Sequence, residues 1–192
     1  MRKAEILVAA EQLFQHYGFA KTTVADIARQ AGIGVGTVYL EFSSKDSISS
    51  ALCHGHRSRV LEAMQAVLAS EGNYSERLVQ LLESRILGLQ SSVGSGLHGD
   101  EIVYAACAAT RRVNEHFDQA ERKLLLGFLE EGNAAGAFAV ADTPITAKIL
   151  LEIYDTVCPP RTRPDAMREQ DRRETLTTLH ALVLGGVLSR SL

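Results

Sequence analysis

Apolar side chains recur every three or four residues along most of this 192-residue chain, and this spacing predicts a protein built from helices. The first such stretch covers residues 2–17. It stops at Gly18, a residue type that commonly ends helices. The apolar stripe of this helix consists of Ile6, Leu7, Ala10, Leu13, Phe14 and Tyr17.

A second helix is expected to begin after Thr23, because Thr23-x-x-Asp26 has the form of a capping box. Its buried stripe consists of Val24, Ile27, Ala28 and Ala31. The segment Gly32-Ile33-Gly34 then predicts a turn, because its two glycines permit backbone angles that other residues avoid. A short third helix begins near Val35 and turns Val38 and Phe42 inward. Two helices around such a turn have the outline of a helix-turn-helix.

The outer side of the short third helix is the candidate DNA-binding surface. Gly36 lets a backbone approach the duplex, Thr37 offers a hydroxyl and a methyl group, and Tyr39 can reach a phosphate. Lys45 adds a cation at the start of the next helix. The predicted contacts in this region are Gly34, Val35, Gly36, Thr37, Tyr39, Leu40 and Lys45. Ordinary packing of an all-helical protein can produce the same spacing, so the pattern alone leaves both interpretations open.

The remainder of the chain predicts a larger helical domain. We expect about nine helices in all, with a DNA-binding domain at residues 1–46 and an effector-binding and dimerisation domain at residues 47–192. A connection rich in glycine and serine is expected at 91–99. The helices predicted in the larger domain cover residues 45–70, 75–90, 100–110, 112–132, 143–157 and 165–188.

The last two predicted helices carry more apolar surface than one neighbour can cover. Leu182, Val183 and Val187 lie on the final helix, where Gly185 and Gly186 allow a close neighbour. This pattern predicts a homodimer that forms a four-helix interface through the last two helices. The alternative is that both helices complete the core of a monomer.

Composition and charge narrow the class of protein. Hydrophobic residues make up 46% of the chain, which is enough for a core, and no apolar run is long enough to span a membrane. The run 6–10 is short and flanked by acids, so we expect no signal peptide and a cytoplasmic protein. The net charge of -3 argues against a protein that coats nucleic acid. The first 48 residues are neutral, so specific binding would be aided by two copies.

Other candidate chemistry is sparse. Three cysteines lie far apart and predict neither a disulfide framework nor a zinc module. The stretch 53–56, Cys-His-Gly-His, could offer at most two metal ligands on one helical face, and packed side chains are the favoured interpretation. No catalytic motif, metal site or cofactor site is predicted, and an enzyme is not expected. The candidate effector-pocket residues are Met64, Tyr104, Cys107, Phe117 and Phe128.

Residue identities in the first fifty positions resemble the N-terminal domain of the TetR family of bacterial transcriptional regulators. The matching residues are Ile6-Leu7-x-Ala9-Ala10-x-x-Leu13-Phe14-x-x-x-x-Gly18-Phe19, then Thr22-Thr23-Val24-x-Asp26-Ile27-Ala28-x-x-Ala31-Gly32-Ile33, then Gly36-Thr37-Val38-Tyr39-x-x-Phe42-x-Ser44-Lys45. The segment 130–138 similarly resembles the end of a long core helix in that family. The resemblance implies an all-helical homodimer in which a small effector changes the spacing of two DNA-reading heads.

The resemblance also implies roles for single residues. Thr22 or Thr23, together with Tyr39 and Lys45, would contact phosphates, and Gly36 and Thr37 would lie at base edges or the backbone. Leu40 and Glu41 depart from the usual pattern, in which a polar residue and then an aromatic residue are frequent. Leu40 suits a thymine methyl group, whereas Glu41 would be repelled by phosphates unless it faces the next helix or accepts from cytosine.

These observations predict a ligand-responsive transcriptional regulator. It would act as a repressor, bind a palindromic operator as a homodimer, and be released by a small-molecule effector. The alternative is a ligand-binding or interaction protein of the same fold with weak or no specific DNA binding. A third interpretation, an enzyme or metal sensor built on 53–56, is the weakest.

Overall fold

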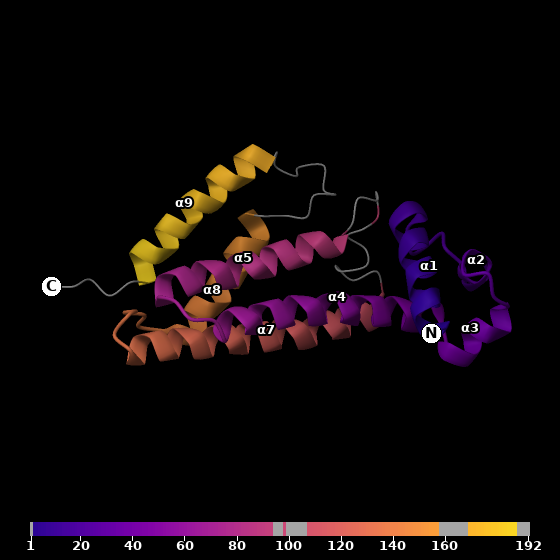
Figure 1. Cartoon of the computed structure of the whole chain (residues 1–192), viewed down its shortest axis with the longest axis horizontal. Helices are drawn as coiled ribbons and strands as arrows, with labels where there is room; N and C mark the ends of the chain where they lie inside the picture. The colour runs from indigo at the N-terminus through magenta and orange to yellow at the C-terminus, as the bar shows by residue number, and fades with distance from the viewer. Residues whose placement is uncertain (1, 94–97, 99–106, 158–168, 188–192) are drawn as a thin grey trace. The chain divides into compact units, whose positions relative to one another are not determined.

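The computed structural model describes residues 2–93, 98, 107–157 and 169–187, and its regular elements there are eight helices (Figure 1). The predicted all-helical fold is therefore confirmed. None of the helices in these ranges is both long and apolar enough to cross a membrane. The helices are α1 (Arg2–Tyr17), α2 (Val24–Gln30), α3 (Val35–Glu41), α4 (Lys45–Leu68), α5 (Tyr74–Val93), α7 (Ala108–Ala134), α8 (Thr143–Val157) and α9 (Glu169–Val187).

The bounds of α1 and α8 agree with the periodicity, but α5 extends to Val93, into the connection predicted at 91–99. One predicted helix break is also wrong. Residues 108–134 form a single helix, where the sequence suggested that one helix ends at Thr110 and another begins at Arg112. The Thr110 hydroxyl accepts a hydrogen bond from the Cys107 amide at 3.1 Å, so these residues start α7. Residues 100–106 of the helix predicted at 100–110 lie outside the described residues.

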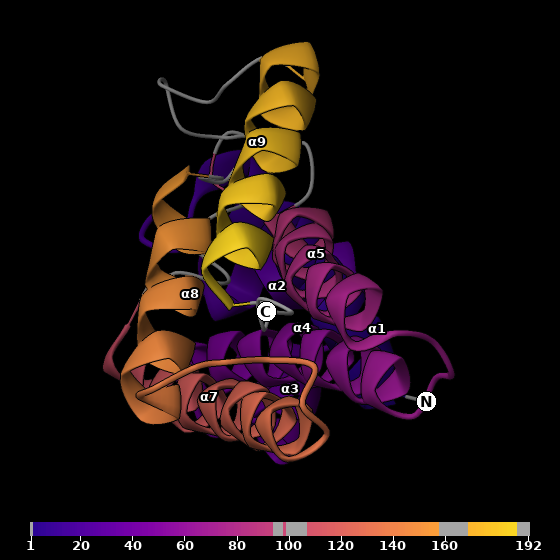
Figure 2. The ribbon, with the colours of Figure 1, turned by 90° about the vertical axis from the view of Figure 1, so that its left-hand side faces the viewer.

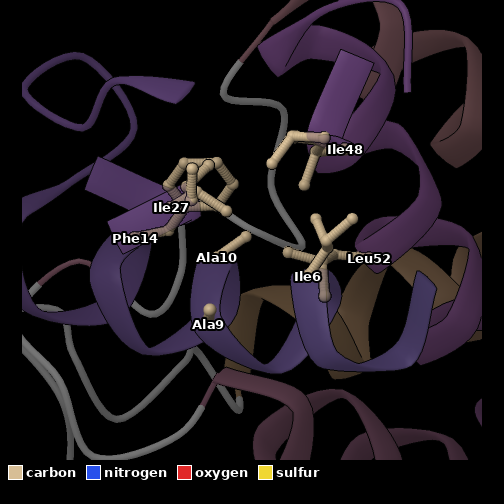
Figure 3. Close-up of a cluster of buried hydrophobic side chains, with 9 residues drawn as sticks. Ile6, Ala9, Ala10, Phe14, Ile27, Ile48 and Leu52 are labelled. Atoms are coloured by element: carbon tan, nitrogen blue, oxygen red, sulfur yellow. The ribbon is translucent and has the colours of Figure 1, made fainter. Parts of the chain in front are cut away.

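One compact unit consists of residues 1–59 and 89–117 and contains the helix-turn-helix. Its core joins α1, α2, α3 and the first part of α4, and Figure 3 shows how these side chains meet. Each is at most 6% exposed, and full burial of a large apolar side chain contributes about 1.5–3 kcal/mol. The cluster consists of Ile6, Ala9, Ala10, Phe14, Ile27, Ala28, Val38, Ile48 and Leu52.

The turn between α2 and α3 uses only one of its two glycines for an unusual backbone. Gly32 has φ of 68°, a left-handed conformation that side chains disfavour. The Ile33 amide then donates to the Ala28 carbonyl at 3.0 Å, which closes the end of α2. Gly34 has ordinary extended angles, φ −73° and ψ 146°, so the turn uses the backbone freedom of Gly32 only.

A second compact unit consists of residues 60–88 and 118–192, described where the structure describes them. The predicted stripe of α5, from Leu78 to Leu89, is buried. Figure 2 shows α9 beside α5 and α8, and the contacts of His180 support this arrangement. His180 Nδ1 lies 3.7 Å from a Glu83 oxygen, and its ring stacks on Tyr154 with centroids 5.8 Å apart.

The end of α7 folds back on itself through a glycine. A Cβ atom built at Gly132 would lie 2.1 Å from the ring of Phe138, so only glycine allows this ring to pack here. Amides of Ala137 and Phe138 both donate to the Gly132 carbonyl, at 2.9 and 3.1 Å. Phe138 also lies edge-on to Phe128 and Tyr74. This geometry explains why residue 132 is a glycine.

A buried ion network joins α5, α7 and α8. Arg85 Nε donates to Glu121 at 2.6 Å, and its terminal nitrogens donate to both Asp155 oxygens at 2.6 and 3.0 Å. Arg85 and Glu121 are 3% and 0% exposed. Burial disfavours the charged guanidinium, but hydrogen bonds and charges from Asp155 and Glu121 raise the pKa of Arg85.

We expect Arg85→Met to lower the free energy of unfolding by about 3–5 kcal/mol, because the buried charge of Glu121 would lose the guanidinium that balances it. The double variant Arg85→Met/Glu121→Leu should recover much of that loss in urea unfolding. Lys148→Met is the control, since its ion pair with Glu152 is exposed and should matter by less than about 1 kcal/mol. A double variant as unstable as the single one would contradict this account of the network.

Candidate nucleic-acid interface

The outer side of α3 faces solvent and carries both apolar and hydroxyl-bearing side chains. Val38 is completely buried, whereas Tyr39 is 54% and Leu40 is 83% exposed. Val35 and the backbone at Gly34 and Gly36 are also exposed, and Thr37 is half-buried. This arrangement places the predicted contact residues of α3 on the side away from the core. Their contact with DNA itself stays a prediction.

The two adjacent threonines before α2 have different surroundings. Thr22 is 2% exposed and its hydroxyl donates to the Gly18 carbonyl at 2.9 Å, so this side chain is committed to the end of α1. Thr23 is exposed and caps α2, and its reciprocal hydrogen bonds with Asp26 confirm the capping box. Of the alternatives Thr22 and Thr23, the geometry favours Thr23 as the residue able to reach a phosphate.

Lys45 is hydrogen-bonded to the backbone of the segment between α1 and α2. Its ammonium donates to the carbonyls of Phe19 and Thr22 at 2.7 and 2.9 Å and lies 4.2 Å from the centroid of the Phe19 ring. Two of its three donor hydrogens are therefore used within the protein. Lys45 closes the link between α1 and α2, a structural role that the sequence did not reveal, and one donor is left for a phosphate.

Lys21 is a second cation, beside the start of α2, that the sequence pattern did not single out. Its side chain is exposed and makes no hydrogen bond or ion pair with any residue that the structure describes. It lines a hollow with Tyr17 and Arg29, next to the start of α2. Arg29 pairs with Asp26, whose pKa is lowered mainly by hydrogen bonds from Thr23. Lys21 lies two residues before the capping box, and this position in the sequence could have identified it as a candidate.

His56 links α1 to α4. Its Nε2 lies 2.9 Å from Glu11, and Arg59 donates to its Nδ1 at 2.6 Å. A guanidinium only donates, so Nδ1 accepts and Nε2 carries the proton. The hydrogen bond from His56 lowers the pKa of Glu11 despite its partial burial. Cys53 in turn donates to Asn114 at 3.5 Å, so Cys53 and His56 of the Cys-His-Gly-His stretch both have partners within the protein.

The candidate effector residues are distributed over both units. In the second unit Met64 is fully buried, and Phe128 lines a groove between α4 and α7. In the first unit Phe117 is 4% exposed and lines a separate hollow, and Cys107 is half-buried beside Thr110. Tyr104 lies outside the described residues. The sequence pattern had treated these five residues as one set.

A helix-turn-helix with one face in the core and the other in solvent is the arrangement that many DNA-binding transcriptional regulators use. The model of "Bacterial regulatory proteins, tetR family" matches residues 6–52. The HTH-type transcriptional regulator YhgD of Bacillus subtilis is 30% identical over 160 residues, 80% of each chain. The chain belongs to the TetR family.

Two further likenesses agree with this assignment. The HTH-type transcriptional repressor KstR2 of Rhodococcus jostii is 28% identical over 138 residues, 71% of this chain and 68% of that protein. The solved structure of the fatty acid degradation regulator FadR from Bacillus halodurans has a TM-score of 0.77. It is 23% identical, covers 96% of this chain and 95% of its own, and shows the shared fold. The predicted class of protein is confirmed.

We expect Lys45→Met and Lys21→Met to separate structural from electrostatic roles. Lys45→Met removes two charge-assisted hydrogen bonds and should lower the free energy of unfolding by about 1–2 kcal/mol. Lys21→Met should leave stability unchanged and reduce the salt dependence of DNA binding by about one ion. Urea unfolding and binding at several salt concentrations measure the two effects. Equal stability of both variants would contradict the structural role of Lys45.

Gly36→Ala tests whether DNA approaches the backbone of α3. A Cβ atom at Gly36 meets nothing within 4 Å in the protein, and alanine favours helix by up to about 1 kcal/mol. The variant should be at least as stable as the natural protein yet bind DNA about tenfold more weakly, because the methyl group would occupy the approach path. Gly55→Ala is the control, since its site in α4 is equally open. Unchanged DNA affinity in Gly36→Ala would exclude close approach at this position.

Proposed function

We propose that this regulator is a repressor that binds a twofold-symmetric operator as a homodimer and leaves it when a small molecule binds. The observation that carries the proposal is the exposed face of α3, held by the complete burial of Val38 on its inner side. Such a helix can enter a major groove while the helices beneath it contact the DNA backbone. The protein would act in the cytoplasm.

Phosphates and bases would be contacted by different residues. Tyr39, Thr23 and Lys21 offer hydroxyl or ammonium donors to phosphates, and the remaining donor of Lys45 adds to them. Leu40 is the most exposed of the large apolar side chains described, and it suits the methyl group of a thymine. Thr37 and the backbone at Gly36 complete the surface that would face the bases.

Dimerisation through α8 and α9 is supported by the apolar side chains that these helices expose. Ile145, Ile149 and Leu182 are 52%, 45% and 70% exposed within one chain. Cβ atoms built at Gly185 and Gly186 meet nothing within 4 Å, so α9 offers a flat surface to a neighbour. A second copy would cover this surface, as dimers of helix pairs do.

The groove of the second unit is the proposed effector site. Its volume is about 540 Å³, within the range of small-molecule sites. Its apolar lining comes from Leu61 and Leu68 of α4 and Leu124 and Phe128 of α7. Gln65, Lys123 and Glu131 supply its polar groups. An effector with an apolar body and one polar end fits this lining, and it would release DNA by favouring a second state of the dimer.

Selection of bound sequences from the DNA upstream of the gene tests this function. We expect a palindromic site bound in preference to random duplex, and Leu40→Ala should lose about 1 kcal/mol of preference for thymine at one symmetric position. Leu87→Ala, which truncates another exposed leucine, is the control and should change neither affinity nor preference. Equal affinity for promoter and random DNA would support the alternative, a protein of this fold without specific DNA binding.

A further inference from the structure

A hollow of about 330 Å³ lies in the first unit between α4 and the beginning of α7. Its lining repeats at helical spacing, with Ser50 and His54 one turn apart on α4 and three successive turns of α7 opposite them. Both walls therefore stand on regular helices, which hold side chains more rigidly than loops do. The lining residues are Ser50, His54, Ala109, Arg112, Val113, His116 and Phe117.

The floor of this hollow is an aromatic ring flanked by two imidazoles. Phe117 is 4% exposed, and the rings of His54 and His116 meet it edge-on with centroids 5.2 and 5.6 Å away. Ser58 lies 3.3 Å from Nδ1 of His54, which further limits the rotation of that ring. The floor thus offers a flat apolar contact with polar nitrogen atoms at its edges.

The charged side chain that lines the hollow, Arg112, is basic. Arg112 is exposed and has no hydrogen bond or ion pair with any described residue, so its guanidinium is available to a ligand. A second guanidinium, that of Arg57, is buried and lies 5.9 Å from the centroid of the Phe117 ring. None of the described residues that line the hollow is acidic. An anion would therefore meet several donors and no repelling carboxylate.

We propose that this hollow binds a small aromatic carboxylate. The carboxylate would pair with the planar fork of Arg112, which matches two oxygens at once. His54 and His116 would donate to the same group, while Phe117 and Val113 contact the flat apolar body. Inorganic phosphate fits less well because it leaves the aromatic floor without a partner. This site goes beyond the proposed function, since it lies in the unit of the helix-turn-helix and not in the groove of the second unit.

Benzoate is the probe, and imidazole resonances of the full-length free protein are the readout. Titration should shift the resonances of His54 and His116 in a saturable way with a dissociation constant that is roughly millimolar or lower. His54→Gln and His116→Gln assign the two signals. Benzyl alcohol keeps the ring without the charge, and phosphate keeps the charge without the ring. Each of them should bind at least about tenfold more weakly than benzoate.

Arg112→Gln should weaken benzoate binding about tenfold, because it removes the charged fork but keeps an exposed polar side chain. Arg111→Gln removes the neighbouring arginine, which does not line the hollow, and should change binding less than about twofold. Circular dichroism verifies that both variants are folded. Equal binding of benzyl alcohol, equal binding of phosphate, or an unaffected Arg112→Gln variant would each overturn the proposal. DNA is absent from this experiment, so its failure leaves the proposed function untouched.

Discussion

The burial of Val38 is the constraint on which the exposed surface of α3, the proposed DNA-binding surface, depends. Seven residues of α3 are too few to form a stable helix in water, so its shape has to come from packing. Val38 is its one fully buried side chain among the described residues, and it enters the cluster formed by Ile6, Ile27 and Ile48. Tyr39 and Leu40 point outward only because Val38 points inward. A surface able to read bases is thus a consequence of core packing in α1, α2 and α4.

Polar contacts hold the same helices at defined positions. Lys45 joins the start of α4 to the carbonyls of Phe19 and Thr22, and His56 joins α4 to Glu11 of α1. Both are long-range contacts made by residues that sequence patterns associate with ligands, a phosphate for Lys45 and a metal for His56. The structural use of Lys45 does not exclude phosphate binding, since it orients the remaining donor. If Lys45 binds a phosphate as proposed, its loss would affect DNA binding and folding together.

The sequence predicted those features that depend on local spacing. The bounds of α1, the cap of α2 at Thr23 and the start of α8 at Thr143 follow from periodicity and capping residues within a few positions. The predicted break near Thr110 was wrong because Thr110 lies in the first turn of α7, where its hydroxyl accepts a hydrogen bond from the Cys107 amide. Periodicity shows which face of a helix is buried but not which residue meets it. The partners of Lys45, His56 and Arg85 therefore could not be predicted.

The continuity of α4 connects the proposed DNA-binding and effector-binding roles. Lys45, the first residue of α4, is hydrogen-bonded to the backbone between α1 and α2. Leu61 and Leu68, near the end of α4, line the groove of the second unit. A ligand changes DNA affinity only if it binds two states of the protein with different affinity. In the proposed function α4 would couple the two sites, because it carries both Lys45 and a wall of the groove. The Lys45 contacts would then transmit a change in α4 to the segment between α1 and α2.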